Sequence, residues 1–266
     1  MTGVAAYDPI GPIAALLPDF GASELHRGAG LIRISLPVPL SDGRQPVFIL
    51  DVGTSGGAIS VRETVPAHLP SFCPDRHINH DGTFCLFWRA VDGIEVVNPE
   101  TARDWLETLV RFLQLQLRAA RLRRWPDGRG RSHGAAAFYQ HRAEAAAARL
   151  GEPFATDIVE GRLSTRRKGG SAEGTAIRVM KEGRRLFSVW ERSRRVVNLR
   201  QPCLCPAGSG SGPVILRSCG SHAAAAADLA MELNEMAAAE REFWKSMQGA
   251  PCCGTMADCP LAGASS

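Results

Sequence analysis

Residues 73–88 read CPDRHINHDGTFCLFW, and the rest of the chain is interpreted around this stretch. An Asp-Gly pair favours a tight turn because glycine accepts a positive φ, so Asp81-Gly82 is expected to reverse the chain. The apolar run 84–88 is then expected to enter the core. Cys85 stands at the join, which puts a thiol at the mouth of a turn.

A thiol in this position has two interpretations. A large partner can reach it there, and His77, His80 or the turn amides could lower its pKa, as a nucleophilic cysteine requires. A cysteine is also a common residue of apolar cores. The stretch by itself leaves both interpretations open.

The order of residues resembles the signature of ubiquitin-conjugating enzymes. His77-Ile78-Asn79, then Asp81-Gly82, then Cys85-Leu86 is similar to the family's His-Pro-Asn, Gly and Cys-Leu motif. Ile78 stands where the family has proline, and Asn79 lies six residues before Cys85. The resemblance covers residues 30–150.

This resemblance implies a catalytic set of Cys85, Asn79 and His77. In the family the cysteine carries a ubiquitin-like protein as a thioester. The asparagine steadies the oxyanion that forms when an amine attacks that thioester. Whether His77, His80 or Asp81 tunes the thiol stays open.

The chain is similar to the divergent prokaryotic members encoded in bacterial antiviral, CBASS-type operons. That similarity implies a role in antiphage defence. The cargo is then a cGAS-like nucleotidyltransferase or a bacterial ubiquitin-like protein, and the acceptor is a lysine of a target protein. A separate activating enzyme is a further expected partner, because the sequence has no recognisable glycine-rich nucleotide loop.

Two other function classes compete with this one. The same fold could serve as a non-catalytic binding module with a zinc-stabilised docking tail. Alternatively, the protein is metal-dependent or redox-active and its chemistry lies in the tail.

Hydrophobic periodicity predicts an α+β fold with an antiparallel meander packed on a long helix. Strands are expected over 31–37, 47–52 and 58–62. Asn98-Pro99-Glu100 predicts the start of a helix over 99–124. The spacing of its apolar residues predicts one buried face. That face consists of Leu106, Leu109, Val110, Leu113, Leu117 and Ala120.

A small basic β element is expected to follow the first domain. It is expected to begin with an exposed loop at 165–171. Two strands at 175–180 and 186–190 follow, joined by a hairpin turn at 181–184, with a possible third strand at 196–199. Further helices are expected at 13–17, 135–150 and 223–247. The sequence therefore predicts a catalytic domain at 1–150, a basic β element at 151–200 and a cysteine-rich helical module at 201–266.

Six of the eight cysteines lie in the last 64 residues. The Cys203-Leu204-Cys205 pair and the glycine turn after it resemble the SEC-C zinc motif. Thiolates and imidazole at this spacing suit structural zinc. The expected ligands are Cys203, Cys205, Cys219, Cys252, Cys253 and Cys259, with His222 as an alternative. Incidental thiols and a thiol relay at the CxC pair are the other interpretations.

The net charge of +4 is unevenly distributed, since residues 101–200 carry 22 basic and 10 acidic side chains. This block could steer an acidic protein or nucleic acid. It has no interleaved aromatic platform, so a solvated arginine-rich face is favoured and nucleic acid is not expected as a partner.

Three of the 31 basic residues are lysines. An enzyme that carries an activated acyl group would modify itself less with few lysines, although compositional bias explains the same count. No apolar run approaches a membrane span and no export signal is visible, so no membrane partner is expected. The cysteines then favour thiols or metal in a reducing cytoplasm.

Overall fold

The computed structural model describes residues 8–55, 58–88, 90–91, 93–126, 130–203 and 215–262. Contacts divide the chain into two units: residues 1–127 with 249–266, and residues 128–248. The helix Ala136–Leu150, expected in the first domain, lies in the second unit. The end of the chain, expected in the cysteine-rich module, lies in the first unit.

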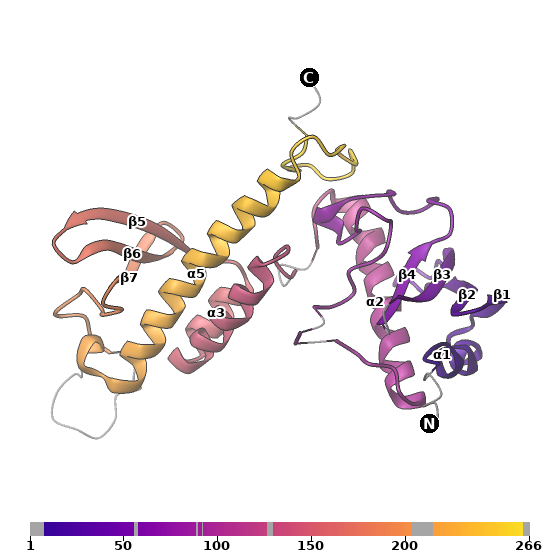
Figure 1. Ribbon diagram of the computed structural model, residues 1–266, viewed down its shortest axis with the longest axis horizontal. Coiled ribbons are helices and arrows are strands. Elements are labelled where there is room, and N and C mark those ends of the chain that lie inside the picture. Colours follow the sequence, from indigo (N-terminus) through magenta and orange to yellow (C-terminus); the bar gives the residue numbers. More distant parts are fainter. Residues whose placement is uncertain are drawn as a thin grey trace, which may run out of the picture. The chain divides into compact units, whose positions relative to one another are not determined.

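The first unit contains a four-stranded antiparallel sheet in the order β1-β2-β3-β4 (Figure 1). Its strands are β1 (Ser23–Gly28), β2 (Leu31–Pro37), β3 (Val47–Ser55) and β4 (Ala58–Glu63). Ile34 pairs with Leu50 and Ile32 with Val52, and these four side chains are fully buried. The expected meander is confirmed. β1 was not expected, because all its residues are exposed and it has no apolar alternation.

Helix α2 (Pro99–Leu122) packs its apolar face into the same core as the sheet. Asn98 caps it, since the Asn98 carboxamide accepts the Thr101 amide at 2.9 Å. The expected buried face is half right. Leu106, Leu109 and Leu113 are buried as expected, but Ala120 is exposed. The buried face also includes residues that were not predicted from the apolar spacing. The added members are Ala102, Trp105, Phe112, Gln116 and Ala119.

A short α-helix and two 3₁₀ turns are the other described elements of the first unit. Helix α1 (Ile10–Leu16) buries Ile10 and Ile13, and the 3₁₀ turn η1 (Leu17–Phe20) follows it. A further 3₁₀ turn, η2 (Pro74–Arg76), lies inside the cysteine-containing stretch.

The second unit is a helical layer against a three-stranded antiparallel sheet (Figure 1). Helix α3 (Ala136–Leu150) packs along the long helix α5 (Gly220–Ser246). The short helix α4 (Glu152–Val159) packs against α3. Buried alanines, among them Ala143 and Ala147 on α3 and Ala226 on α5, keep these helices close.

The sheet of the second unit has the order β5-β6-β7. Its strands are β5 (Leu163–Ser171), β6 (Gly174–Lys181) and β7 (Arg184–Trp190). The hairpin at 181–184 is confirmed. The expectation of a loop at 165–171 was wrong, because this charged, glycine-containing segment pairs with β6. At 196–199 a single bridge, Val196 to Val189, replaces the expected strand.

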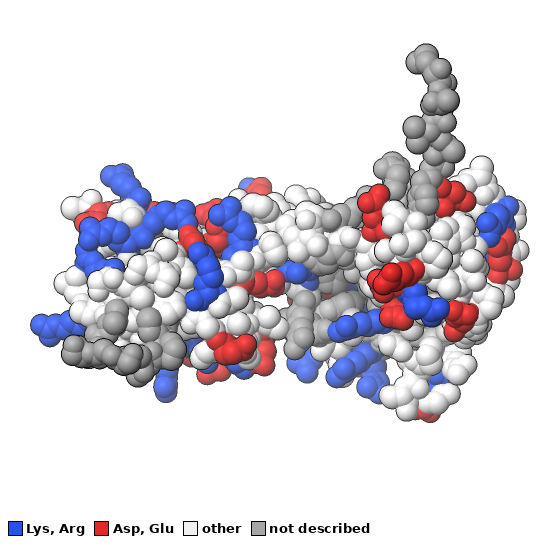
Figure 2. All heavy atoms as spheres, turned by 90° about the horizontal axis from the view of Figure 1, so that it is seen from below, with Lys and Arg blue, Asp and Glu red and all other residues white. Residues whose placement is uncertain are grey.

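Lys and Arg side chains gather over the strands of the second unit (Figure 2). Arg166, Arg167 and Lys168 on β5 are exposed, as are Arg184 and Arg185 on β7. The expected basic β element therefore exists as a sheet. Within the described ranges, no helix has both the length and the apolar character needed to cross a membrane.

Candidate functional site

Cys85 is held by its backbone and is exposed to solvent. Its amide donates to the carbonyl of His77 at 2.8 Å, and the preceding Phe84 amide donates to Val61 of β4 at 2.8 Å. The Phe84 ring is buried and stacks on Phe112 of α2, with 5.2 Å between ring centroids. The sheet and the helix therefore fix the position of Cys85, and its side chain is exposed.

The Asp81-Gly82 turn orders the loop that precedes Cys85. The Gly82 amide donates to the Asn79 carbonyl at 2.9 Å, and Gly82 has the positive φ of 78° expected for this turn. The Thr83 hydroxyl donates to the Asp81 carboxylate at 2.6 Å and lowers the pKa of that carboxyl. The turn predicted from the sequence is therefore confirmed.

The side chain of Asn79 is exposed and is held on this turn. Its Nδ2 donates to the Thr83 Oγ1 at 3.0 Å. An asparagine amide has two N–H donors, and this bond uses one. The Asp81–Thr83–Asn79 chain of hydrogen bonds thus orders a side-chain donor in the loop that leads to the thiol.

The two histidines of the stretch pack on aromatic rings. His77 is half-buried, with its ring edge-on to Trp125 at 4.8 Å, and His80 stacks on Phe72 at 4.8 Å. The backbone of His77 ends η2 in the left-handed region, with a φ of 55°. The contribution of His77 to the position of Cys85 comes from its carbonyl oxygen.

Arg76 is a site residue that the sequence analysis missed. It is 1% exposed, and its guanidinium donates to Gln116 Oε1 at 2.8 Å and to the Gln116 carbonyl at 3.0 Å. The Gln116 amide donates back to the Arg76 carbonyl. Burial lowers the pKa of Arg76 below its ordinary value. No spacing rule singles out an arginine that fastens a loop to a distant helix.

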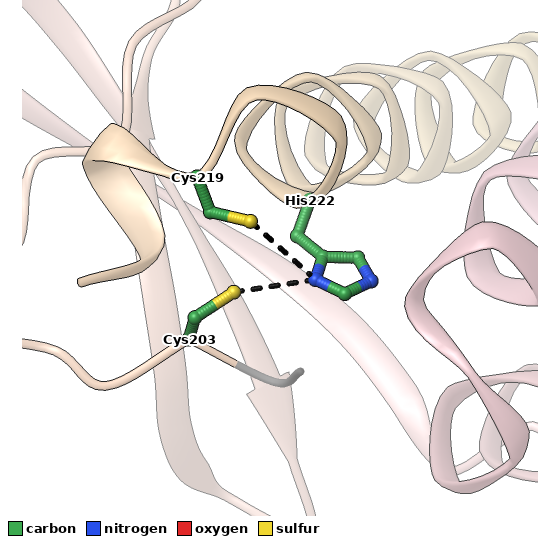
Figure 3. Close-up of side chains that lie close together, drawn as sticks. All are labelled: Cys203, Cys219 and His222. Carbon is green, nitrogen blue, oxygen red and sulfur yellow. Dashed lines mark hydrogen bonds between the residues drawn. The ribbon is translucent and has the colours of Figure 1, made fainter. Parts of the chain in front are cut away.

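Two cysteines and a histidine meet in the second unit (Figure 3). His222 Nδ1 lies 3.2 Å from Cys203 Sγ and 3.7 Å from Cys219 Sγ. Cys219 is the N-cap of α5 and His222 lies in its first turn. The amide of Leu216 donates to the Gln201 carbonyl at 2.9 Å, which brings the segment of Cys203 against that of Cys219.

The chain matches two family models. Residues 20–127 match a model described as a prokaryotic E2 domain, and residues 132–261 match one described as a cysteine-rich domain C-terminal to an E2 domain. The chain is a prokaryotic E2 domain followed by a C-terminal cysteine-rich domain. No curated protein and no solved structure gives a significant match.

The E2 domain contains the whole stretch around Cys85, so the resemblance seen in the sequence is confirmed at the level of the domain. The boundaries of the cysteine-rich domain cut across the structural units. Most of its residues form the second unit, but residues 249–261 pack with the E2 domain.

The cluster in the cysteine-rich domain fits a metal ion. Tetrahedral zinc, with Zn–S near 2.3 Å and Zn–N near 2.0 Å, separates sulfur from nitrogen by about 3.6 Å. The two observed separations lie on either side of that value. Among the described residues, Cys203, Cys219 and His222 form the one group of at least three possible ligands within 4.8 Å of one another.

The other expected metal ligands are distributed differently. Cys205 lies outside the described residues. Cys252, Cys253 and Cys259 lie in the first unit with the E2 domain, whereas Cys203, Cys219 and His222 lie in the second. The five described cysteines among the expected ligands are therefore divided between the two units.

Proposed function

We propose that the E2 domain is a conjugating enzyme that carries the C-terminus of a protein as a thioester on Cys85. The observation that supports this most directly is the exposed Cys85 on a loop whose backbone is fastened to β4 and to His77. The match to a prokaryotic E2 domain supplies the reaction class.

Two acyl transfers make up the proposed reaction. The Cys85 thiolate attacks the activated carbonyl of the cargo, a thioester forms, and the leaving group departs from the carbonyl carbon. A target lysine amine then attacks the same carbon, an amide bond forms, and the Cys85 thiolate is expelled. The amine loses its proton during the attack.

Asn79 is proposed to steady the oxyanion of the second step. A hydrogen-bond donor stabilises the oxyanion effectively only when it is held in position before the reaction. The Thr83 hydroxyl holds the Asn79 carboxamide, and Asp81 holds Thr83. His77 is proposed to act through its carbonyl, which anchors the amide of Cys85.

The partners are proposed from the family resemblance. A cGAS-like nucleotidyltransferase, or a bacterial ubiquitin-like protein, supplies the C-terminus, and a separate enzyme activates it. The setting is antiphage defence in a CBASS-type operon. The chain has three lysines, Lys168, Lys181 and Lys245, and all lie in the second unit. The first unit, which contains the E2 domain and is called the E2 unit below, therefore offers no lysine to its own thioester.

The cysteine-rich domain is proposed to hold structural zinc at Cys203, Cys219 and His222, with Cys205 as the fourth ligand. A structural zinc site is closed by four protein ligands. The ion would fasten the start of α5 to the segment that follows the sheet of the second unit.

The first prediction concerns a covalent adduct on Cys85. After co-expression with the neighbouring operon genes, intact mass under denaturing, non-reducing conditions is expected to show a protein-sized increment that a thiol reductant removes. The Cys85→Ala variant is expected to lack it, because alanine has no nucleophile. The mass of the increment identifies the cargo.

The control for this experiment is the Cys219→Ser variant, which removes a thiol of the second unit and is expected to retain the adduct. If all partners are expressed and competent and wild type still shows no increment, the E2 domain is a binding module and not a conjugating enzyme.

The second prediction separates the two steps. Asn79→Ala is expected to load cargo onto Cys85 at the wild-type level but to transfer it to an amine about 100- to 1000-fold more slowly, the usual effect of losing one oxyanion donor. Asn79→Asp, which is similar in size but has no N–H donor, is expected to behave in the same way. Single-turnover discharge of the purified thioester to free lysine measures the rate. An equal fall in loading and discharge would show that Asn79 only shapes the loop.

A further inference from the structure

Three cysteines of the chain end lie in the E2 unit, where one of them meets Cys73. The Sγ atoms of Cys253 and Cys73 are 2.9 Å apart, although 180 residues separate them in the sequence. Cys252 precedes Cys253 directly in the sequence, and Cys259 follows six residues after it in the same segment. Cys73 is 1% and Cys259 is 6% exposed, and the other two are half-buried. The four thiols therefore lie in the chain-end segment 252–259 or in contact with it.

Local contacts hold two of these sulfurs and the backbone of a third. The Gly254 amide donates to the Cys252 sulfur at 3.4 Å, and the Cys253 sulfur lies 3.1 Å from the Thr255 hydroxyl oxygen. In both cases the partner is two residues after the cysteine. The Arg76 amide donates to the Cys73 carbonyl at 3.0 Å. Hydrogen bonds from amides stabilise thiolates, and the partners of a ligand's other contacts orient it toward a metal.

The segment that carries the three cysteines is held in place by other contacts as well. The Ala257 amide donates to the Arg123 carbonyl at the end of α2, at 2.7 Å. The Arg76 guanidinium donates to the Thr255 hydroxyl at 3.3 Å. Arg76 also supplies a buried positive charge, which a cluster of thiolates with excess negative charge requires.

We propose that Cys73, Cys252, Cys253 and Cys259 bind a second zinc ion, in the E2 unit, that fastens the end of the cysteine-rich domain to the stretch around Cys85. Four thiolates are a closed, tetrahedral ligand set typical of structural zinc. Zinc separates its sulfur ligands by about 3.8 Å, so a bound ion would lengthen the Cys73–Cys253 contact. It would also draw Cys252 and Cys259 toward this contact, because no three of these sulfurs lie within 4.8 Å of one another.

This second site is coupled to the catalytic loop through the backbone. Cys73 and Ile78 exchange two hydrogen bonds, at 3.0 and 3.1 Å, and Ile78 forms a bridge to Phe84, the residue before Cys85. An ion on Cys73 therefore restrains the strand-like segment on which the Cys85 loop rests. The proposal does not depend on thioester chemistry, because the site can exist in an E2 domain that carries no cargo.

The third prediction is the zinc content of the full chain after anaerobic purification and dialysis against metal-free buffer, measured by mass spectrometry of the element. Wild type is expected to contain two zinc ions per chain. Cys252→Ser/Cys259→Ser is expected to contain one, as is Cys203→Ser/Cys219→Ser, and the combination of all four substitutions none. Cys85→Ser is the matched control, with an unchanged zinc content.

A second measurement covers the case of a variant that does not fold. Cobalt added to the metal-free wild-type chain is expected to bind in two steps with the visible absorption of tetrahedral thiolate sites, and the four-sulfur site gives the stronger sulfur-to-metal charge transfer. An unchanged zinc content in the folded Cys252→Ser/Cys259→Ser variant would overturn the proposal. So would a single cobalt step, or recovery of Cys73 and Cys253 as a disulfide from the anaerobic preparation.

Discussion

Replacing Cys85 with serine is expected to convert the thiol-sensitive adduct into one that thiol reductant does not cleave. Serine Oγ occupies nearly the same position as the sulfur, since the loop backbone is held by Val61 and His77 independently of the side chain. The product is an oxygen ester, which thiols and amines attack far less readily than a thioester. Dilute hydroxide is expected to release the cargo from this variant.

The measurement is intact mass of wild type and Cys85→Ser after co-expression, each before and after reductant. Slower loading is expected for serine, because its hydroxyl is a much weaker acid than a thiol. A thiol-sensitive adduct that persists in Cys85→Ser would mean that another cysteine carries the cargo. The Cys203-Leu204-Cys205 pair, considered as a thiol relay from the sequence, is then the next site to substitute.

Replacing Arg76 with alanine is expected to destabilise the E2 unit by about 2–4 kcal/mol. The change leaves the buried Oε1 of Gln116 without its donor, which costs about 1–3 kcal/mol, and leaves a cavity between η2 and α2. Loss of the desolvation cost of a buried guanidinium offsets part of this. The net expected effect on the free energy of unfolding is still a loss of stability.

Hydrogen exchange of α2 peptides in increasing urea measures this effect, since it resolves the E2 unit from the second unit. Arg103→Ala is the matched control. Arg103 pairs with Asp19 at 2.5 Å, both side chains are nearly half exposed, and the expected cost is below ~1 kcal/mol. Equal exchange in the two variants would show that the Gln116 contacts contribute nothing.

Local signals in the sequence predicted the frame of the E2 unit. The alternation of apolar residues at 31–37 predicted the bounds of β2, and Asn98-Pro99 predicted the start of α2. Both signals are local, because a helix N-cap and the alternation of side chains along a strand depend on residues close together in the sequence. Asp81-Gly82 gave the turn before Cys85 in the same way. The expectations failed where local signals are weak or are overridden by pairing. β1 has no apolar alternation, and the charged β5 becomes a strand through its contact with β6.

Helix α4 shows the same limit. It was not predicted from the sequence, although Pro153 occupies its first turn, where the missing N–H costs nothing. The sheet and helices of the second unit bury a common core, whereas the sequence predicted that these elements belong to three separate modules.

By itself the sequence determined the elements around Cys85, its turn and its family resemblance, because all of these reside in residues close together in the chain. Only the tertiary structure showed that Arg76 reaches Gln116, that His222 joins Cys203 and Cys219, and that the end of the chain meets Cys73. The spacing of the cysteines along the sequence could not predict which of them lie in each unit. Contacts over 180 residues arise from packing of whole elements, and no local pattern in the chain encodes which thiol meets which.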